Sequence, residues 1–174
     1  MNPLADAPQT ADLIARLSDW LAERAPAAER DNWALVGLRR RGDDLARRMA
    51  KAVGIDQCGA LDITMYRDVL VGTNHVPDVG ITDIPFALDG LDVVLVDDVL
   101  MTGRSIRAAL DAMADLGRPR RVWLAVLVDR GPAFRELPIA ADVAALVHDG
   151  PGTVAVRLAP TDDTDAVDLT EDEA

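Results

Sequence analysis

The sequence is poor in residues that cross-link a chain or bind structural metals. Among 174 residues it has one cysteine, Cys58, and two histidines, His75 and His148, which excludes an internal disulfide and leaves no cluster with metal-ligand spacing. It also lacks any stretch near the roughly 20 apolar residues of a membrane span, and its polar start differs from a secretory signal. We therefore expect a cytoplasmic protein with no membrane partner and no structural zinc.

Long disorder and a disulfide-stapled miniprotein are also excluded. Hydrophobic residues make up 49% of the chain and charged residues 28%, a balance typical of one packed domain. The net charge of −12 is concentrated at the end, because residues 160–174 contain seven acids and no base. We predict a folded domain over residues 1–159 and an acidic, mostly disordered tail over residues 160–174.

Lysine is almost absent, since 17 of the 18 basic residues are arginine. Several of these arginines cluster at positions 39–41, 47 and 48, and others at 118, 120 and 121. Arginine forks bind phosphate well, although a solvated charged face would also account for the arginines outside positions 39–41. The globally acidic chain therefore contains local basic patches.

Apolar patterning alternates between helices and buried strands. A 3.6-residue period predicts helices between Thr10 and Pro26, between Gly42 and Gly54, and over residues 102–117. Apolar or alternating runs predict strands at residues 33–38, 61–67, 92–97, 122–128 and 143–147, and residues 68–85 have the composition of a mobile loop. Strands buried on both faces and separated by helices predict an α/β fold with a mainly parallel sheet.

The most informative segment is VVLVDDVLMTGRS, residues 93–105. A buried strand ends at Asp97 and Asp98, and a helix follows a Thr-Gly-Arg-Ser turn. In a parallel sheet these acids face the ligand crevice, while a helix N-terminus offers free N–H groups to a phosphate dianion. Carboxylates accept hydrogen bonds from sugar diols, so the segment predicts binding of a ribose 5-phosphate. The turn alone could be a helix cap, and the acid pair alone could be solvated. Their joint occurrence after a buried strand favours binding of a sugar phosphate.

The same segment resembles the phosphoribosyl pyrophosphate (PRPP) signature of type I phosphoribosyltransferases. Residues 36–50, 61–68, 116–131 and 135–142 are similar, in order and spacing, to segments of the PyrR family, whose members are bifunctional regulators of pyrimidine operons with uracil phosphoribosyltransferase activity. The resemblance covers about residues 10–160. It implies that residues 1–159 form a type I phosphoribosyltransferase domain with a small hood.

The resemblance also implies roles for matching residues. Asp97, Asp98 and Arg41 would be catalytic, the acids by orienting the diol and the arginine by helping pyrophosphate leave. Arg67 would add positive charge near the departing pyrophosphate. Asp129, Arg130 and Gly131 would hold the base, although they could equally be a plain strand end. The full set implied to bind PRPP or nucleotide is Arg40, Arg41, Gly42, Arg67, Asp97, Asp98, Val99, Leu100, Met101, Thr102, Gly103, Arg104 and Ser105.

The implied reaction joins uracil to PRPP, giving UMP and pyrophosphate, with Mg²⁺ held through the substrate rather than by protein ligands. Homodimers or larger assemblies are implied as well. Met101 favours a pyrimidine, because many purine enzymes of this kind carry an acid there. Two departures stand out: residues 132–134 (Pro-Ala-Phe) replace a single histidine in the base loop, and Arg157 is the one arginine or lysine after Asp142, where regulatory members bind leader RNA.

Three functions therefore stay open at this point. The first is a uracil phosphoribosyltransferase. The second, which can coexist with it, is an attenuator that senses UMP and binds pyr leader RNA. The third is a PRPP-dependent transferase for another base.

Overall fold

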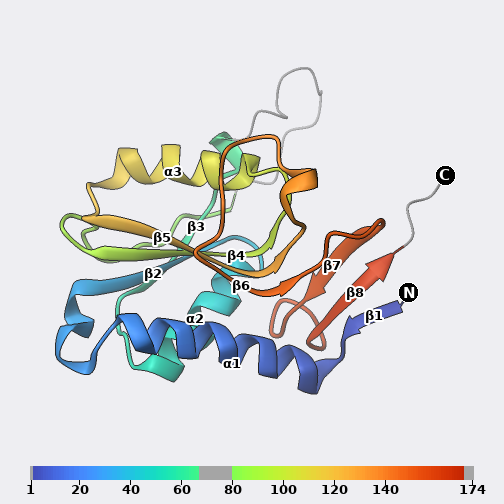
Figure 1. Ribbon diagram of the computed structural model, residues 1–174. Coiled ribbons are helices and arrows are strands. Elements are labelled where there is room, and N and C mark those ends of the chain that lie inside the picture. Colours follow the sequence, from blue (N-terminus) through green and yellow to red (C-terminus); the bar gives the residue numbers. More distant parts are fainter. Residues whose placement is uncertain (1, 67–79, 171–174) are drawn as a thin grey trace.

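The structure is a computed structural model that describes residues 2–66 and 80–170 (Figure 1). Its centre is a five-stranded parallel sheet in the order β3-β2-β4-β5-β6. The strands are β2 (Trp33–Leu38), β3 (Cys58–Leu61), β4 (Asp92–Leu100), β5 (Arg121–Asp129) and β6 (Val143–Val147). This sheet confirms the predicted α/β class, because the apolar runs 33–38 and 92–97 lie in its centre, buried on both faces.

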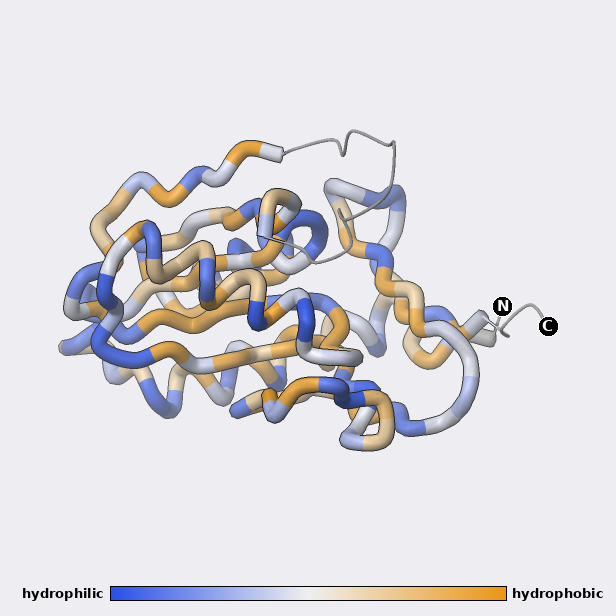
Figure 2. Tube along the Cα trace, turned by 90° about the horizontal axis from the view of Figure 1, so that it is seen from above, coloured by the Kyte–Doolittle hydropathy of each residue, from blue (hydrophilic) through white to orange (hydrophobic). Residues whose placement is uncertain are grey.

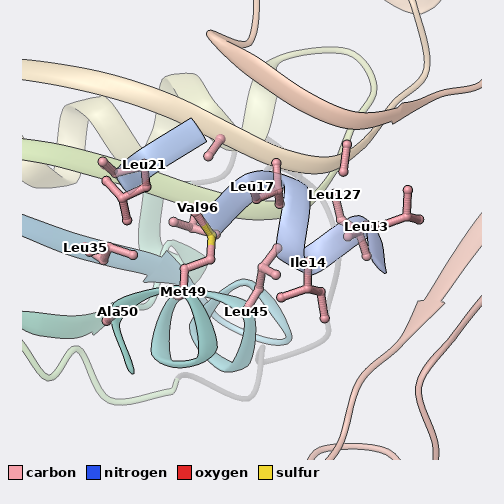
Figure 3. Close-up of a cluster of buried hydrophobic side chains, with 14 of the residues drawn as sticks. Leu13, Ile14, Leu17, Leu21, Leu35, Leu45, Met49, Ala50, Val96 and Leu127 are labelled. Carbon is pink, nitrogen blue, oxygen red and sulfur yellow. The ribbon is translucent and has the colours of Figure 1, made fainter. Parts of the chain in front are cut away.

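Helices cover both faces of this sheet (Figure 1). Helices α1 (Ala7–Arg24) and α2 (Gly42–Val53) lie on one face, and α3 (Arg104–Leu116) lies on the other. Each face encloses its own cluster of buried apolar side chains. Figure 3 shows the first cluster, in which Leu17 of α1 and Met49 of α2 point toward Val96 of β4. None of the helices in the described part of the chain is long and apolar enough to cross a bilayer.

Hydropathy follows this layering. The central strands are largely hydrophobic along their length, whereas hydrophilic residues gather at the turns (Figure 2). Short 3₁₀ helices occupy three connections within residues 2–66 and 80–170: η1 (Ala27–Asn32), η2 (Thr64–Tyr66) and η4 (Pro132–Phe134). The connections at the carboxyl ends of the strands are therefore polar, while the strands themselves supply the core.

A second, antiparallel sheet forms from the two ends of the chain (Figure 1). Its order is β1-β8-β7, with β1 (Asn2–Ala5), β7 (Thr153–Arg157) and β8 (Ala166–Thr170). The prediction of a disordered acidic tail is therefore wrong for residues 160–170. Val167 is fully buried, and arginines elsewhere in the chain pair with Asp162, Asp165 and Asp168. These ion pairs neutralise the acids, so the segment packs against the domain.

Several element boundaries also differ from prediction. Helix α1 begins after Asp6, which forms a capping box with Gln9, while Thr10 is buried inside the helix. The strand predicted over residues 61–67 lies earlier, as β3, and η2 follows it. Strand β4 continues beyond the predicted end to Leu100, and α3 starts at Arg104 rather than at position 102. Most of the predicted mobile loop falls in residues 67–79, outside the described residues.

The three tryptophans form one cluster between α1 and the amino ends of β2 and β5. Trp123 stacks on Trp33 at 6.3 Å between ring centroids and meets Trp20 edge-on at 6.1 Å. The Arg24 guanidinium lies 4.4 Å from the Trp20 ring centroid. Trp33 is buried, and the other two pack against the same core while partly exposed.

Candidate active site

A cavity of about 590 Å³ opens at the carboxyl ends of β2 and β4. Its walls are formed by residues 38–41, 43, 62, 64, 80, 97–99, 105 and 161. The carboxyl ends of neighbouring parallel strands meet at one edge of the sheet, which is why segments far apart in the sequence converge here. Six predicted site residues are brought together in these walls: Arg40, Arg41, Asp97, Asp98, Val99 and Ser105.

The arginine loop, residues 39–41, joins β2 to α2 on one side of the cavity. Arg41 caps α2 with a left-handed backbone, φ 70°, which is unusual for a residue other than glycine. Gly42 lies behind the loop, where an added Cβ would come within 2.6 Å of the Val96 carbonyl oxygen. Its role is thus close packing of α2 on β4. Arg39 Nε is buried and has no hydrogen-bond partner among the described residues, so the loop retains a donor that an anion can satisfy.

The side chain of Arg41 is held by the C-terminal segment. Its Nε and Nη2 donate to the Asp162 carboxylate at 2.8 and 3.0 Å. This charge-assisted pair raises the pKa of Arg41 and lowers the pKa of Asp162. Sequence reasoning missed Asp162, because the partners lie 121 positions apart and the acidic run around Asp162 is typical of a solvated tail.

The two predicted acids line the same cavity from β4, near the carboxyl end of the strand. Asp97 Oδ1 accepts a hydrogen bond from the Asp98 N–H at 3.0 Å, and Asp98 Oδ1 accepts one from the Val99 N–H at 3.0 Å. Burial raises the pKa of Asp98, while the hydrogen bond with Asp97 and the charge of Arg41 act against that rise. A positive charge placed beside Asp98 would therefore stabilise its ionised form.

The Thr-Gly-Arg-Ser turn connects β4 to α3. Gly103 caps the helix with φ 89°, a conformation that favours glycine, and Thr102 Oγ1 accepts the Arg104 N–H at 3.3 Å. Ser105 reaches the cavity wall, but residues 100–104 are not part of it. Leu100, which the resemblance implied to bind PRPP or nucleotide, is buried in the core under α3. Met101 is exposed.

The predicted base-binding residues lie at the end of β5, outside the cavity walls. Asp129 Oδ1 accepts hydrogen bonds from the Gly131 N–H at 2.7 Å and from Arg135 Nη2 at 2.5 Å. Arg135 also donates to the Met101 carbonyl oxygen, so it ties the end of β5 to the turn after β4. Sequence reasoning did not assign this link to Arg135.

Arg130 has a structural environment. Its side chain is almost fully buried and donates to the carbonyl oxygens of His148 at 3.1 Å and Gly150 at 2.7 Å. Its guanidinium also lies 4.3 Å from the Phe134 ring centroid. These contacts use the guanidinium to hold the loop between β6 and β7, whereas the resemblance implied a base contact for this residue. Arg67, predicted near pyrophosphate, lies outside the described residues.

Comparison with known proteins identifies the class first. A model of the phosphoribosyl transferase domain matches residues 2–144. The HGPRT-ase of Leishmania tarentolae, solved in complex with GMP, aligns over 99% of this chain and 98% of its own with a TM-score of 0.74 and 14% identity. A hypoxanthine phosphoribosyltransferase of Trypanosoma cruzi aligns over 98% and 95% with a TM-score of 0.73 and 17% identity. The chain thus has the type I phosphoribosyltransferase fold.

Closer relatives then define the family. The bifunctional protein PyrR of Thermus aquaticus is 45% identical over 177 residues, covering 98% of this chain and 96% of that protein. The protein of the same name from Roseiflexus sp. (strain RS-1) is 54% identical over 144 residues, covering 80% and 76%. The chain belongs to the PyrR family, which confirms the resemblance found in its motifs.

Proposed function

We propose that this chain transfers the phosphoribosyl group of PRPP to uracil, releasing pyrophosphate and forming UMP. One observation carries the proposal: the Asp97–Asp98 pair and the arginine loop face the same cavity at the carboxyl ends of two adjacent parallel strands. A diol needs acceptors and a pyrophosphate needs cations, and the cavity offers both within its walls.

Each wall has a part in this reaction. The carboxylates of Asp97 and Asp98 orient the ribose hydroxyls and stabilise positive charge that grows on the ring as the bond to pyrophosphate loosens. Arg40 and Arg41 stabilise the negative charge that grows on the departing pyrophosphate. The hydroxyl and N–H of Ser105, in the first turn of α3, bind the 5-phosphate at the positive end of the helix dipole.

Mg²⁺ fits this cavity as a substrate-borne ion. Among the described residues no group of three or more histidine, cysteine or acidic side chains could hold a metal. Oxygen donors are nevertheless present, since Asp43 Oδ1 is buried beside the cavity without a hydrogen-bond partner in the described part of the chain. Bound through PRPP, Mg²⁺ would neutralise pyrophosphate oxygens and leave the carboxylates to act on the ribose.

The base loop supports a pyrimidine. The thioether of Met101 cannot accept a proton from a purine, and Arg135 holds the Met101 backbone against Asp129. The Pro-Ala-Phe replacement forms η4, in which Phe134 packs on the Arg130 guanidinium. The longer loop is thereby accommodated in the packing at the end of β5.

The test is a base panel. The protein is incubated with PRPP and Mg²⁺, and with uracil, cytosine, hypoxanthine, guanine or adenine in turn. Pyrophosphate release is measured, and the nucleotide is identified by chromatography. We expect UMP from uracil and no nucleotide above background from the purines. Release with a purine instead, or with no base at all, would contradict the proposal.

The proposal includes regulation through pyr leader RNA as a second, weaker activity. Arg157, the one arginine or lysine after Asp142, donates to Asp168 Oδ2 from Nε and Nη2 at 2.9 and 2.8 Å. Part of its charge is therefore neutralised within the protein. RNA affinity depends strongly on cationic side chains that can bind phosphates and so release counterions. We therefore propose catalysis as the main activity and RNA binding as the weaker one.

A further inference from the structure

The C-terminal segment reaches the candidate site through one ion pair. Arg41 and Asp162 form a bidentate pair, with 34% of the arginine side chain and 18% of the aspartate side chain exposed. Arg41 belongs to the cavity wall, and so does Thr161, the neighbour of Asp162. A residue remote in sequence thus determines where a cavity-lining cation lies.

Asp162 is also held by hydrogen bonds that do not involve Arg41. Its Oδ2 accepts the Leu158 N–H at 2.8 Å, and its own N–H donates to the Leu158 carbonyl oxygen at 2.8 Å. Leu158 is fully buried in the core. The carboxylate is therefore anchored to the core through a tight backbone loop.

Arg41 needs such an anchor. Its backbone is in the left-handed region, φ 70°, which costs a residue with a side chain about 1 kcal/mol or more and persists only when neighbours enforce it. Asp162 engages Nε and Nη2, which form one edge of the planar guanidinium, and this leaves the Nη1 end of the fork free of that pair. A planar group held along one edge has little rotational freedom left.

We infer that Asp162 is a positioning residue, which holds the Arg41 guanidinium in place for the pyrophosphate group of PRPP. The inference rests on the proposed function and adds to it a residue that lies outside the matched motifs. Without Asp162, Arg41 keeps its charge but loses its fixed direction, and its interaction with pyrophosphate then includes the entropic cost of ordering a long side chain.

The same segment contains a matched control. Asp165 accepts hydrogen bonds from Arg48 Nη1 and Nη2 at 2.5 and 2.8 Å and from the Ala159 N–H at 2.9 Å. Neither Asp165 nor Arg48 belongs to the cavity wall. Asp165→Asn therefore removes an equivalent bidentate pair, from the same segment to the same helix, without touching an arginine of the cavity.

The experiment compares wild type, Asp162→Asn and Asp165→Asn in full-length protein. KM for PRPP, KM for uracil and kcat are measured, with calorimetric binding of inorganic pyrophosphate in the presence of Mg²⁺. We expect Asp162→Asn to weaken PRPP and pyrophosphate about tenfold, the order expected for one charge-assisted contact, with KM for uracil unchanged. Asp165→Asn should lower thermal stability to a similar extent and leave both affinities as in wild type.

Equal affinities in the two variants would overturn the inference, and so would tighter pyrophosphate binding by Asp162→Asn, which would show competition for Arg41. Asp162→Glu, which retains a carboxylate, should recover part of the lost affinity and guards against misfolding of the asparagine variant. Pyrophosphate binding needs no base, so the inference is tested even if uracil is not the substrate. A wild type that binds neither PRPP nor pyrophosphate would overturn both the inference and the proposed function.

Discussion

Asp98 combines two properties that rarely coincide at one carboxylate. It lies on the wall of a polar cavity, yet burial raises its pKa, so its charge is held at a cost in the folded protein. The Val99 N–H donates to Asp98 Oδ1, and the Asp98 N–H donates to Asp97 Oδ1, so a backbone hydrogen bond orients each of the two carboxylates. A residue in this position interacts most strongly with a cation that forms only during reaction.

Replacing Asp98 with asparagine separates these properties, because the shape is kept and the charge is lost. We expect kcat for UMP formation to fall on the order of 10²-fold, as when one preorganised electrostatic group is removed. The thermal midpoint should not fall, because the cost of burying a charge disappears. Steady-state rates and thermal melts measure both quantities. Asp163→Asn, at an exposed position, is the control, and an unchanged kcat in Asp98→Asn would contradict the role assigned to this acid.

At the scale of elements, the strands and helices of the main sheet were predictable because their signals are local. The runs 33–38 and 92–97 are apolar along their length, and Gly54 and Gly117 end their helices as expected. Boundaries shifted where a stronger local motif competed, as when the Asp6 capping box set the start of α1. The place of the acid pair at the cavity followed from parallel topology, whereas the place of the arginine loop was implied by the family resemblance.

The order of residues 160–170 was not predictable in this way. Its acids are neutralised by partners over a hundred positions away, such as Arg41 and Arg48, and no local pattern reports those pairs. The same limit applies to Arg130, whose place after a strand was read as a base contact although its guanidinium binds carbonyls of another loop. Partners of long side chains follow from tertiary packing, which composition and periodicity do not encode.

Docking of the C-terminal segment should depend on pH. Hydrogen bonds from Arg41 and Arg48 lower the pKa values of Asp162 and Asp165, so the stabilisation is present above the ordinary aspartate range and is lost as pH falls through the lowered values. We expect the double variant Asp162→Asn, Asp165→Asn to be less stable than wild type at neutral pH, with the difference vanishing in acid. Urea unfolding at a series of pH values measures this. A difference independent of pH would contradict it.

At the scale of the whole molecule, net charge affects the affinity for any nucleic acid. The net charge is −12, and arginines that could face a polyanion are drawn into internal pairs, as with Arg157 and Asp168 or Arg120 and Asp92. Long-range electrostatics thus oppose association with RNA, and each internal ion pair reduces the counterion release that its arginine can contribute.

We therefore expect weak binding of a pyr leader hairpin with a shallow dependence on salt. Filter binding across a salt series gives the slope of log K against log salt concentration, which scales with the number of phosphate contacts. A steep slope, of the size found for about six or more phosphate contacts, would contradict this expectation. It would require a basic surface that the described pairs do not provide.

The tryptophan cluster has a practical consequence for such experiments. All three indoles of the chain lie together at the amino ends of β2 and β5, the end of the main sheet opposite the cavity. Intrinsic fluorescence therefore reports separation of α1 from the sheet during denaturation. The fluorescence should not change when a ligand binds in the cavity near Asp98. Measuring ligand binding by fluorescence therefore needs a reporter dye or an added tryptophan near position 101.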